Sequence, residues 1–559
     1  MRCQLARRAA VLAACGCLLV GGCTAGRPGA AAPPTTLPRT TTPRTTGQAI
    51  VPGPPSPSTT TTPTTPLLGP SVALSGGADP AVAAAAATRA ENRRPGDPDW
   101  QVPPWRIAGP QELAGYSDAV SVLPAQPFRL FVTTTAPSFT VRAFRLGWYG
   151  GAQARLVWQS GQLPGHRQPP PTLGPDHLVT TSWTPAARIG TAGWPAGAYL
   201  LLLTDTRGRV KYVPLTVRSA STRARLVLID AVATYQAYNA WGGWSLYHGP
   251  DGAFATRARK VSFDRPYDEN GARVLTQYEQ GTISQAERLG LPLAYLTSVE
   301  LDTDPGVLTG ARGVVSLGHD EYWTTRMRAA VTRARDTGTN LAFLGANAVY
   351  WRIRFAPSPS AADRAVVGYK SAAPDPVHGP STTTRWRSAP DPDPENSLVG
   401  SLYECFPATG ALVVRDPGSF LFAGTDAHPG SSFPGLIGPE INRAYPIPGT
   451  PATLQVLAHS PVRCGPTGPT ASDLTYYTTT SAAGVVSVGT MLWDKALRGT
   501  SASSGITAPT VTFTRQVTAT LLTAMAAGPM GRAHPSRPDL SSLHEPATTT
   551  TGSAGPVNR

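Results

Sequence analysis

Between residues 100 and 218 the chain alternates short apolar runs with turn residues. The runs are FRLFVTTT (128–135), FTVRAFRLGW (139–148), ARLVWQS (154–160), AYLLLLTD (198–205) and KYVPLTV (211–217). Short strands that are separated by turn residues at roughly ten-residue intervals are typical of an antiparallel β-sandwich. We therefore predict a β-sandwich domain over residues 96–220.

The pattern changes after residue 221, where longer apolar strands alternate with amphipathic helices. The predicted strands are ARLVLIDAV (224–232), PLAYLTSVEL (292–301), ARGVVSLG (311–318) and NLAFLGAN (340–347). Helical patterns at ISQAERLG (283–290) and RMRAAVTRARDTG (326–338) lie between them. This alternation predicts an α/β domain with a largely parallel sheet. From about residue 400 the pattern is mostly β, and it closes with a strand at 484–493 and a helix at 515–528, so the domain covers 221–531.

Polar and aromatic side chains follow three of these strands at the point where each strand ends. They are Tyr235, Tyr238 and Asn239 after the first strand, His319 and Glu321 after the third, and Asn347 after the fourth. Function in an open parallel sheet collects at the carboxyl ends of the strands, so we expect these residues at one edge. In an extended segment His319 and Glu321 face one way and Asp320 the other. Asp320 or Thr324 could cap the following helix.

Each of these residues also has an ordinary structural interpretation. A single glutamate at a strand end more often caps a helix or forms an ion pair, and a neighbouring histidine is often a hydrogen-bond partner. The aromatic residues of YQAYNAWGGWSLY (235–247) are of a type that packs more often than it binds ligands. Convergence of three loops on one edge favours a site. No nucleophile-elbow, HExxH, Walker or dinucleotide motif is present, and no cysteine follows these strands.

The first 23 residues indicate export. Arg2, Arg7 and Arg8 precede the apolar stretch AAVLAACGCLLVGG (9–22), which ends directly before Cys23. Small residues before a cysteine resemble a lipobox, so we expect residues 1–22 to be a lipoprotein signal peptide and Cys23 to carry a lipid anchor. The alternative is an ordinary secretory signal. With the anchor, the protein is expected at the outer face of the cell membrane.

Composition predicts a disordered tether, a disordered tail and a basic surface. Residues 23–95 are rich in Thr and Pro and predict a disordered tether, and residues 532–559 predict a disordered tail. The 559-residue chain has a formal net charge of +14 and is 41% hydrophobic, which is enough for sizeable cores. Because we find no nucleic-acid-binding motif and no dense Lys/Arg run, we interpret the charge as a solvated surface and expect no nucleic acid partner.

Cysteine usage predicts one disulfide. Of six cysteines, two lie in the predicted folded part, Cys405 and Cys464. Two cysteines in an exported chain suggest that they form a disulfide with each other. The alternative is a two-cysteine metal site, although no histidine accompanies either residue at ligand spacing.

Five segments resemble the large (β) subunit of N,N-dimethylformamidase and its relatives. They are FRLGWYGG (144–151), YQAYNAWGGWSLY (235–247), VSFDRPY (261–267), SLGHDEYW (316–323) and LAFLGANAVYWRIRF (341–355). The resemblance covers roughly residues 100–530. It implies an immunoglobulin-like β-sandwich followed by an α/β domain that resembles the class I glutamine-amidotransferase fold, in agreement with the hydrophobic pattern.

The same resemblance implies hydrolysis of a small amide by a mononuclear iron that is held by two tyrosines and a glutamate. Carried onto this chain, the glutamate is Glu321 and one tyrosine is Tyr238. For the second tyrosine the first choice is Tyr199 in the strand AGAYLLLL, and the second choice is Tyr267. Phenolate and carboxylate are hard oxygen donors that suit a ferric ion.

Three further residues match polar or acidic positions of the family site. His319 and Asn347 match residues that line it, and Glu440 of GLIGPEIN (435–442) matches a further acidic group. His319 is placed to take a proton from water and return it to the leaving amine.

Two functions from different classes follow. The first is a surface-anchored, iron-dependent hydrolase of a C–N amide bond. The alternative is a catalytically inactive, envelope-anchored binding or scaffolding lipoprotein. The family's characterised enzyme is cytoplasmic and works with a small partner subunit, so the substrate of an exported chain need not be dimethylformamide. Substrate identity, the small subunit and the oligomeric state stay open.

Overall fold

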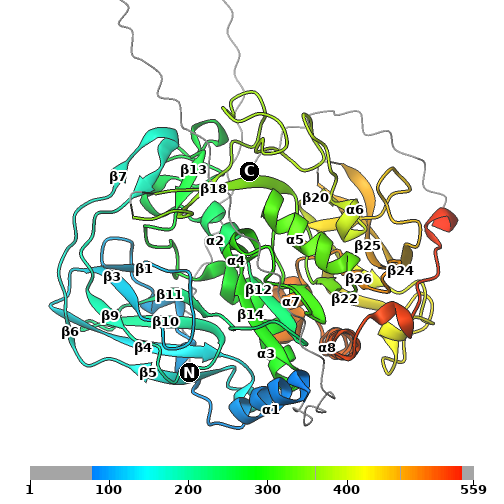
Figure 1. Ribbon diagram of the computed structural model, residues 1–559, viewed down its shortest axis with the longest axis horizontal. Helices are drawn as coiled ribbons and strands as arrows, with labels where there is room; N and C mark the ends of the chain where they lie inside the picture. Colours follow the sequence, from blue (N-terminus) through cyan, green and yellow to red (C-terminus); the bar gives the residue numbers. More distant parts are fainter. Residues whose placement is uncertain (1–78, 359, 466, 544–559) are drawn as a thin grey trace, which may run out of the picture. The chain divides into compact units, whose positions relative to one another are not determined.

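The computed structural model describes residues 79–543, apart from residues 359 and 466 (Figure 1). The predicted signal peptide, the lipidation site Cys23 and most of the Thr/Pro segment lie outside the described residues. Within the described part of the chain, no helix is both long and apolar enough to cross a lipid bilayer.

Two largely antiparallel sheets pack face to face in the first part of the fold. One contains β1 (Leu113–Ser117), β3 (Phe128–Thr134) and β9 (Ala187–Ile189). The other has the order β2 (Ser121–Val122), β11 (Val210–Val217), β10 (Gly197–Asp205), β4 (Ser138–Leu146) and β5 (Ala154–Gln159), with β6 (Leu163–Pro164) beside β4. Leu130 of the first sheet and Val141 and Leu201 of the second share one core. The predicted β-sandwich and its five predicted strands are confirmed.

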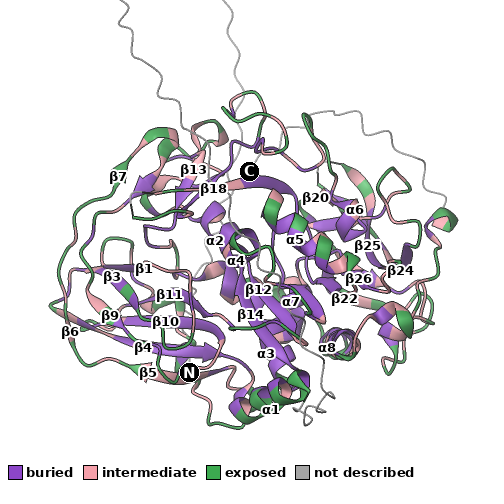
Figure 2. Ribbon diagram, in the orientation of Figure 1, coloured by how far each residue is buried: buried purple, intermediate pink, exposed green. Residues whose placement is uncertain are grey.

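The α/β part is built on a nine-stranded sheet. Its parallel half is β14 (Leu293–Thr297), β12 (Leu226–Asp230), β15 (Gly313–Ser316), β17 (Asn340–Phe343) and β26 (Gly484–Ser487). Its antiparallel half is β25 (Gly468–Thr478), β24 (Gln455–Cys464), β21 (Ala408–Val413) and β22 (Ser432–Ile437). Every residue of the five parallel strands is buried (Figure 2), which explains their unbroken apolar sequences.

Helices cover both faces of the parallel half. Leu226 and Leu228 of β12 share a core with α3 (Gln280–Arg288), α7 (Trp493–Arg498) and α8 (Ala508–Ala527). Val227 and Ile229 share the other core with α4 (Ser298–Thr303) and α5 (Thr325–Asp336). This alternation along one strand is the period of two that a sheet buried on both faces requires. The architecture is therefore mixed and β-rich with several helices, as predicted.

Shorter elements complete the described fold. A four-stranded sheet has the order β13 (Lys260–Ser262), β19 (Ala365–Val367), β18 (Trp351–Ala356) and β16 (Tyr322–Thr324). Two-stranded sheets pair β20 (Leu402–Cys405) with β23 (Ile441–Arg443), and β7 (Thr172–Leu173) with β8 (Val179–Thr180). The remaining α-helices are α1 (Pro80–Asn92), α2 (Val232–Tyr238) and α6 (Asn396–Val399), and a π-helix spans Leu275–Glu279.

Two segments that composition assigned to disorder are ordered in part. Helix α1 lies within the expected tether. It forms because its sequence PAVAAAAATRAEN is alanine-rich and because the Asp79 side chain caps its first turn. Ala81 and Ala84 of this helix are buried. In the expected tail Leu540 is buried, and the Asp539 carboxylate accepts a hydrogen bond from the Val456 amide at 2.7 Å. A few local contacts are enough to order segments whose average composition is unfavourable.

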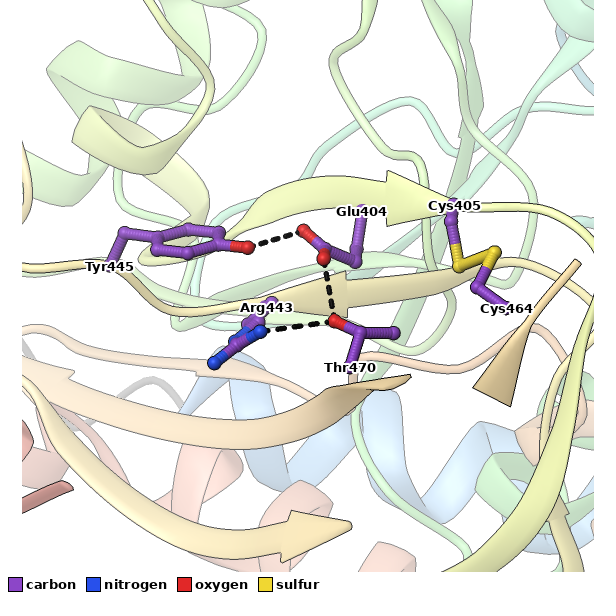
Figure 3. The surroundings of a disulfide bond; sticks show 6 residues. All are labelled: Glu404, Cys405, Arg443, Tyr445, Cys464 and Thr470. Carbon is purple, nitrogen blue, oxygen red and sulfur yellow. Dashed lines mark hydrogen bonds between the residues drawn. A yellow bond between two sulfur atoms is a disulfide. The ribbon is translucent and has the colours of Figure 1, made fainter. Parts of the chain in front are cut away.

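The predicted disulfide between Cys405 and Cys464 is confirmed and joins the ends of β20 and β24 (Figure 3). Cys405 also pairs across strands with Ile441, the residue after Glu440. Figure 3 shows a chain of hydrogen-bonded polar side chains next to the disulfide, made of Tyr445, Glu404, Thr470 and Arg443. The disulfide therefore ties β20 to β24, and β20 pairs with β23, the strand that directly follows Glu440.

Candidate functional site

The candidate site lies where three parallel strands end. Strand β12 runs into α2, whose last residue is Tyr238. The segment between β15 and β16 carries His319 and Glu321, and the segment after β17 carries Asn347. All of these except Tyr238, which is partly buried, have exposed fractions of 3% or less. The structure thus brings together residues that the strand-end pattern predicted.

Glu321 is the centre of the hydrogen bonds at this edge. Its Oε2 accepts from the Tyr238 hydroxyl at 2.8 Å and from the Tyr247 hydroxyl at 2.8 Å. Its Oε1 accepts from Tyr247 at 2.9 Å and from Asn347 Nδ2 at 3.1 Å. The two tyrosine hydroxyl oxygens are themselves 2.9 Å apart. Two phenol oxygens and one carboxylate therefore meet at a single buried point.

Local structure explains why Tyr247 reaches Glu321. Gly242 and Gly243 have φ values of +82° and +96°, a region that favours glycine, and they reverse the chain after α2. The Leu246 amide then donates to the Ala237 carbonyl at 2.9 Å. As a result the Tyr247 ring stacks on the Tyr238 ring with centroids 4.5 Å apart.

His319 lies beside the phenol–carboxylate group. Its Nε2 is 3.0 Å from the Tyr238 hydroxyl and 3.6 Å from Glu321 Oε2. Burial lowers the pKa of His319 to about 3, and the positive charge of Arg273 acts in the same direction. The ring is therefore neutral at neutral pH, the form that can accept a proton. The His319 side chain faces Glu321 as the i, i+2 spacing predicted, whereas Asp320 accepts from the Ser316 hydroxyl at 3.1 Å.

Burial also shifts the acids of the site. It raises the pKa of Tyr238 and Tyr247 well above the usual value, and the negative charge of Glu321 adds to both shifts. Burial raises the pKa of Glu321, although the Lys370 charge opposes this shift. Burial, followed by the charge of Glu321, raises the pKa of Glu440 to about 8. The site is rich in oxygen donors that a nearby cation would help to ionise.

Lys370 is a site residue that the sequence analysis missed. Its Nζ lies 3.3 Å from the centre of the Tyr247 ring and 4.8 Å from that of Trp351. Burial lowers the pKa of Lys370 well below its usual value. Lys370 has a φ of +60° and Asn347 a φ of +58°, in the left-handed region that non-glycine residues seldom occupy. Such strained backbone clusters at functional sites.

Three buried polar atoms near Glu321 make no hydrogen bond to any residue that the structure describes. They are Asn347 Oδ1, Lys370 Nζ and Glu440 Oε2. Native proteins pair the great majority of such atoms. Unpaired atoms around a carboxylate are the arrangement that a ligand or ion would complete.

The donor set fits iron better than a softer metal. Among the described residues no group of three His, Cys, Asp or Glu side chains is placed to hold a metal ion. The donors at this site are instead Tyr238, Tyr247 and Glu321, which are hard oxygen ligands of the type that suits a ferric ion. Two of the unpaired atoms nearby, Asn347 Oδ1 and Glu440 Oε2, are further oxygen donors.

The structure places Tyr199 and Tyr267 elsewhere, and this corrects the expected second ligand. Tyr199 lies on β10 in the sandwich core, where its hydroxyl donates to the Pro195 carbonyl at 2.6 Å. Its position in β10 alternates with that of Leu200 and matches that of Leu201, so the strand itself directs the ring into the sandwich. Tyr267 is partly buried and lines the small cavity beside Tyr238, but the second tyrosine that hydrogen-bonds to Glu321 is Tyr247.

Two other strand-end residues are structural. The Tyr235 hydroxyl donates to the Glu279 carboxylate, and Asn239 Nδ2 donates to the Pro266 carbonyl at 2.9 Å. Tyr247 could have been found from the sequence, since it ends the motif YQAYNAWGGWSLY that already supplies Tyr238. Lys370 gave no such signal, because it follows a strand of a separate small sheet.

Residues 140–506 match the family described as N,N-dimethylformamidase beta subunit-like, C-terminal. No curated protein matches this chain. Among solved structures, a cycloisomaltooligosaccharide glucanotransferase of Paenibacillus sp., complexed with cycloisomaltoheptaose, is 12% identical with a TM-score of 0.13. That alignment covers 22% of this chain and 17% of the other, and a likeness this small carries no argument about fold or function.

Proposed function

Because the chain belongs to the N,N-dimethylformamidase beta subunit-like family, we propose that it is an iron-dependent hydrolase of a C–N amide bond. The observation that carries this proposal is the meeting of two phenol hydroxyls and the Glu321 carboxylate at distances of 2.8–2.9 Å. Tyr238, Tyr247 and Glu321 would hold the metal, with Tyr247 in the place first expected for Tyr199.

The neighbouring side chains have separable roles in this proposal. When bound, the iron would polarise the amide carbonyl and lower the pKa of water. His319, neutral and 3.0 Å from the Tyr238 hydroxyl, takes a proton from the attacking water and returns it to the leaving amine. Asn347 orients the Glu321 carboxylate from 3.1 Å. Burial and the charge of Glu321 raise the pKa of Glu440 to about 8, which favours the protonated form that can donate a hydrogen bond.

The proposal extends to fold relationships and location. We assign the sandwich (96–220) to the immunoglobulin-like type and the α/β domain (221–531) to the class I glutamine-amidotransferase type, by the resemblance of the sequence motifs. Lipidation at Cys23 would anchor the enzyme at the outer face of the membrane. There it would act on an extracellular amide, with or without a small partner subunit.

A catalytically inactive binding lipoprotein is the second candidate. The observation that favours it is the size of the cavity beside Tyr238 and Arg273, about 10 Å³, which is room for one water molecule. Because Glu321, His319 and Asn347 are also buried, the site would need to open before it admits an amide. Iron content and turnover therefore have to be measured together.

The test is elemental analysis of the full chain, purified after expression with iron, combined with detection of amine released from a panel of amides. We expect about one iron per chain, a visible phenolate-to-iron absorption band, and turnover. Tyr247→Phe should lose the iron, whereas Tyr267→Phe serves as the matched control and should keep it. A chain that binds no iron and releases no amine would favour the inactive candidate.

A further inference from the structure

A cleft of about 650 Å³ lies between the sandwich and the α/β part. Its walls include Tyr212 of β11, residues of the stretch 269–280 that contains the π-helix, and five residues near the start of the sandwich, Trp100, Gln101, Val102, Pro104 and Ile107. The volume lies within the range of small-ligand sites in proteins. It far exceeds the cavity of about 10 Å³ beside Tyr238.

Uncharged hydrogen-bonding side chains dominate the cleft. Gln153 Oε1 accepts from Gln280 Nε2 at 3.2 Å and from Gln101 Nε2 at 3.4 Å, which sets three carboxamides in a row. The Gln153 amino group and the Gln277 carboxamide make no hydrogen bond to a described residue. Trp105, next to the cleft residue Pro104, is 76% exposed. Carboxamides that offer both donors and acceptors, beside an exposed aromatic ring, suit a neutral polar ligand.

The charged groups of the cleft are compensated within the protein. Glu269 Oε1 lies 3.0 Å from Arg273 Nε, and Arg498 Nε lies 3.4 Å from Asp494 Oδ2. A charged ligand would therefore have to compete with existing ion pairs. This arrangement favours a ligand without net charge.

One segment joins the cleft to the candidate active site. Glu269 lines the cleft, while its ion-pair partner Arg273 lines the small cavity beside Tyr238. Farther along the segment, Gln277 lines the cleft and the ring of Tyr278 lies 5.6 Å from that of His319. The Glu269–Arg273 pair is partly exposed, and pairs of this kind are weak, so it can open. Residues 269–278 therefore contribute side chains both to the cleft and to the surroundings of the candidate site.

We propose that the cleft binds a neutral oligosaccharide of N-acyl amino sugars and presents an N-acyl group to the Glu321 cluster. This inference rests on the proposed amide hydrolysis and names its substrate class. In the reaction water forms the new C–O bond, the C–N bond breaks, and the proton goes to the amine, which leaves a carboxylic acid and an amino sugar. Vicinal hydroxyls and N-acyl groups match the donor and acceptor pairs of the glutamines, and a sugar ring can stack on Trp105.

A peptide is the competing occupant. Peptides commonly bind by adding a strand to a free sheet edge. Beside the cleft the start of edge strand β5 is already used, because the Asp97 amide donates to the Ala154 carbonyl at 2.9 Å. The cleft therefore offers side-chain rather than backbone recognition, which favours the sugar.

The test measures binding to the full chain by titration calorimetry. The probes are a tetramer of N-acetylglucosamine, the glucose tetramer without N-acyl groups, and an N-acetylated tetra-alanine amide. We expect the first probe to bind most tightly. Gln277→Ala and Trp105→Ala, both at exposed positions, should each weaken its binding about 3- to 10-fold. Gln516→Ala on α8, outside the cleft, is the control and should leave binding unchanged.

Several outcomes overturn the proposal: no saturable binding of the sugar, binding that ignores both cleft variants, or tighter binding of the peptide. Failure of the proposed chemistry is distinguishable from failure of the cleft. Glu321→Gln should keep sugar binding while it loses turnover. Release of amine from small amides without any sugar binding would remove the cleft proposal alone.

Discussion

Two buried clusters in this protein place tyrosines around a glutamate, and they differ in how the glutamate is satisfied. In the first, Glu287 of α3 accepts from Arg145 at 2.6 Å and from Tyr295 at 2.5 Å. Asn92 of α1 donates to its other oxygen. Arg145 also donates to the Tyr149 hydroxyl at 2.9 Å. Charge and hydrogen bonds are complete, so this network joins the sandwich to the α/β sheet and leaves nothing to bind.

The Glu321 cluster has similar residue types but is left incomplete. Its carboxylate receives only neutral donors, and the basic side chain of Lys370 lies over the Tyr247 ring without a hydrogen bond to any described residue. Completed polar networks stabilise and specify a fold, whereas perturbed and unpaired groups collect where chemistry occurs. This contrast supports the proposal that the oxygen donors at Glu321 hold a ligand.

The largest effect is expected for Glu321→Gln. The amide keeps the shape of the side chain but removes the charge, so we expect turnover to fall by about 10²–10³-fold or more, the scale for losing a group that stabilises developing charge. Iron content should fall with it, while the urea midpoint changes little. Retained iron and turnover in a folded variant would contradict the assignment of Glu321 as a ligand.

The matched change in the completed cluster is Arg145→Met. It leaves the buried Glu287 without its cation, so we expect a loss of about 3–5 kcal/mol in the free energy of unfolding, measured by denaturant titration. Iron content and turnover of the folded fraction should stay at the level of the unchanged chain. Adding Glu287→Gln to Arg145→Met should restore part of the stability. If Arg145→Met lost iron instead of stability, the two clusters would not differ in function.

The strands that support the site could be predicted from the sequence more completely than the residues that form it. The unbroken apolar strands and their order imply that the strands ending at residues 230, 316 and 343 end at the same edge of the sheet. The residues that follow these strands, Tyr238, Glu321 and Asn347, could therefore be predicted to lie together. Tyr199 was expected only from the family resemblance, although the hydrophobic pattern had already placed its strand in the sandwich, in a different sheet from β12. Lys370 could not be predicted, since its place depends on tertiary packing of a small sheet and on an unusual backbone conformation.

Removing the Cys405–Cys464 disulfide tests how far the Glu321 cluster depends on the strands that support it. Cys405→Ser together with Cys464→Ser opens a loop with a sequence separation of 59, which should cost about 4 kcal/mol of stability by the chain-entropy relation. Cys405 pairs with Ile441 beside Glu440, so turnover should fall more than iron content, which depends on the three proposed ligands. Loss of iron equal to that of Tyr247→Phe would show that the strand pair positions the ligands as well.

The smallest effect is expected for Tyr199→Phe, and it is the sharpest test of which tyrosine matters. The change removes one hydroxyl that donates to the Pro195 carbonyl at 2.6 Å and keeps the ring that stacks on Trp194 with centroids 5.1 Å apart. We expect the free energy of unfolding to fall by about 1 kcal/mol, the usual net value of one hydrogen bond, with iron content and the visible absorption band unchanged.

Tyr247→Phe removes a hydroxyl of the same kind, but one that lies 2.8 Å from Glu321 Oε2, and should abolish the band with little change in stability. If the Tyr199 variant lost iron and the Tyr247 variant kept it, the ligand would have to come from the sandwich, and the site described at the ends of β12, β15 and β17 would be wrong.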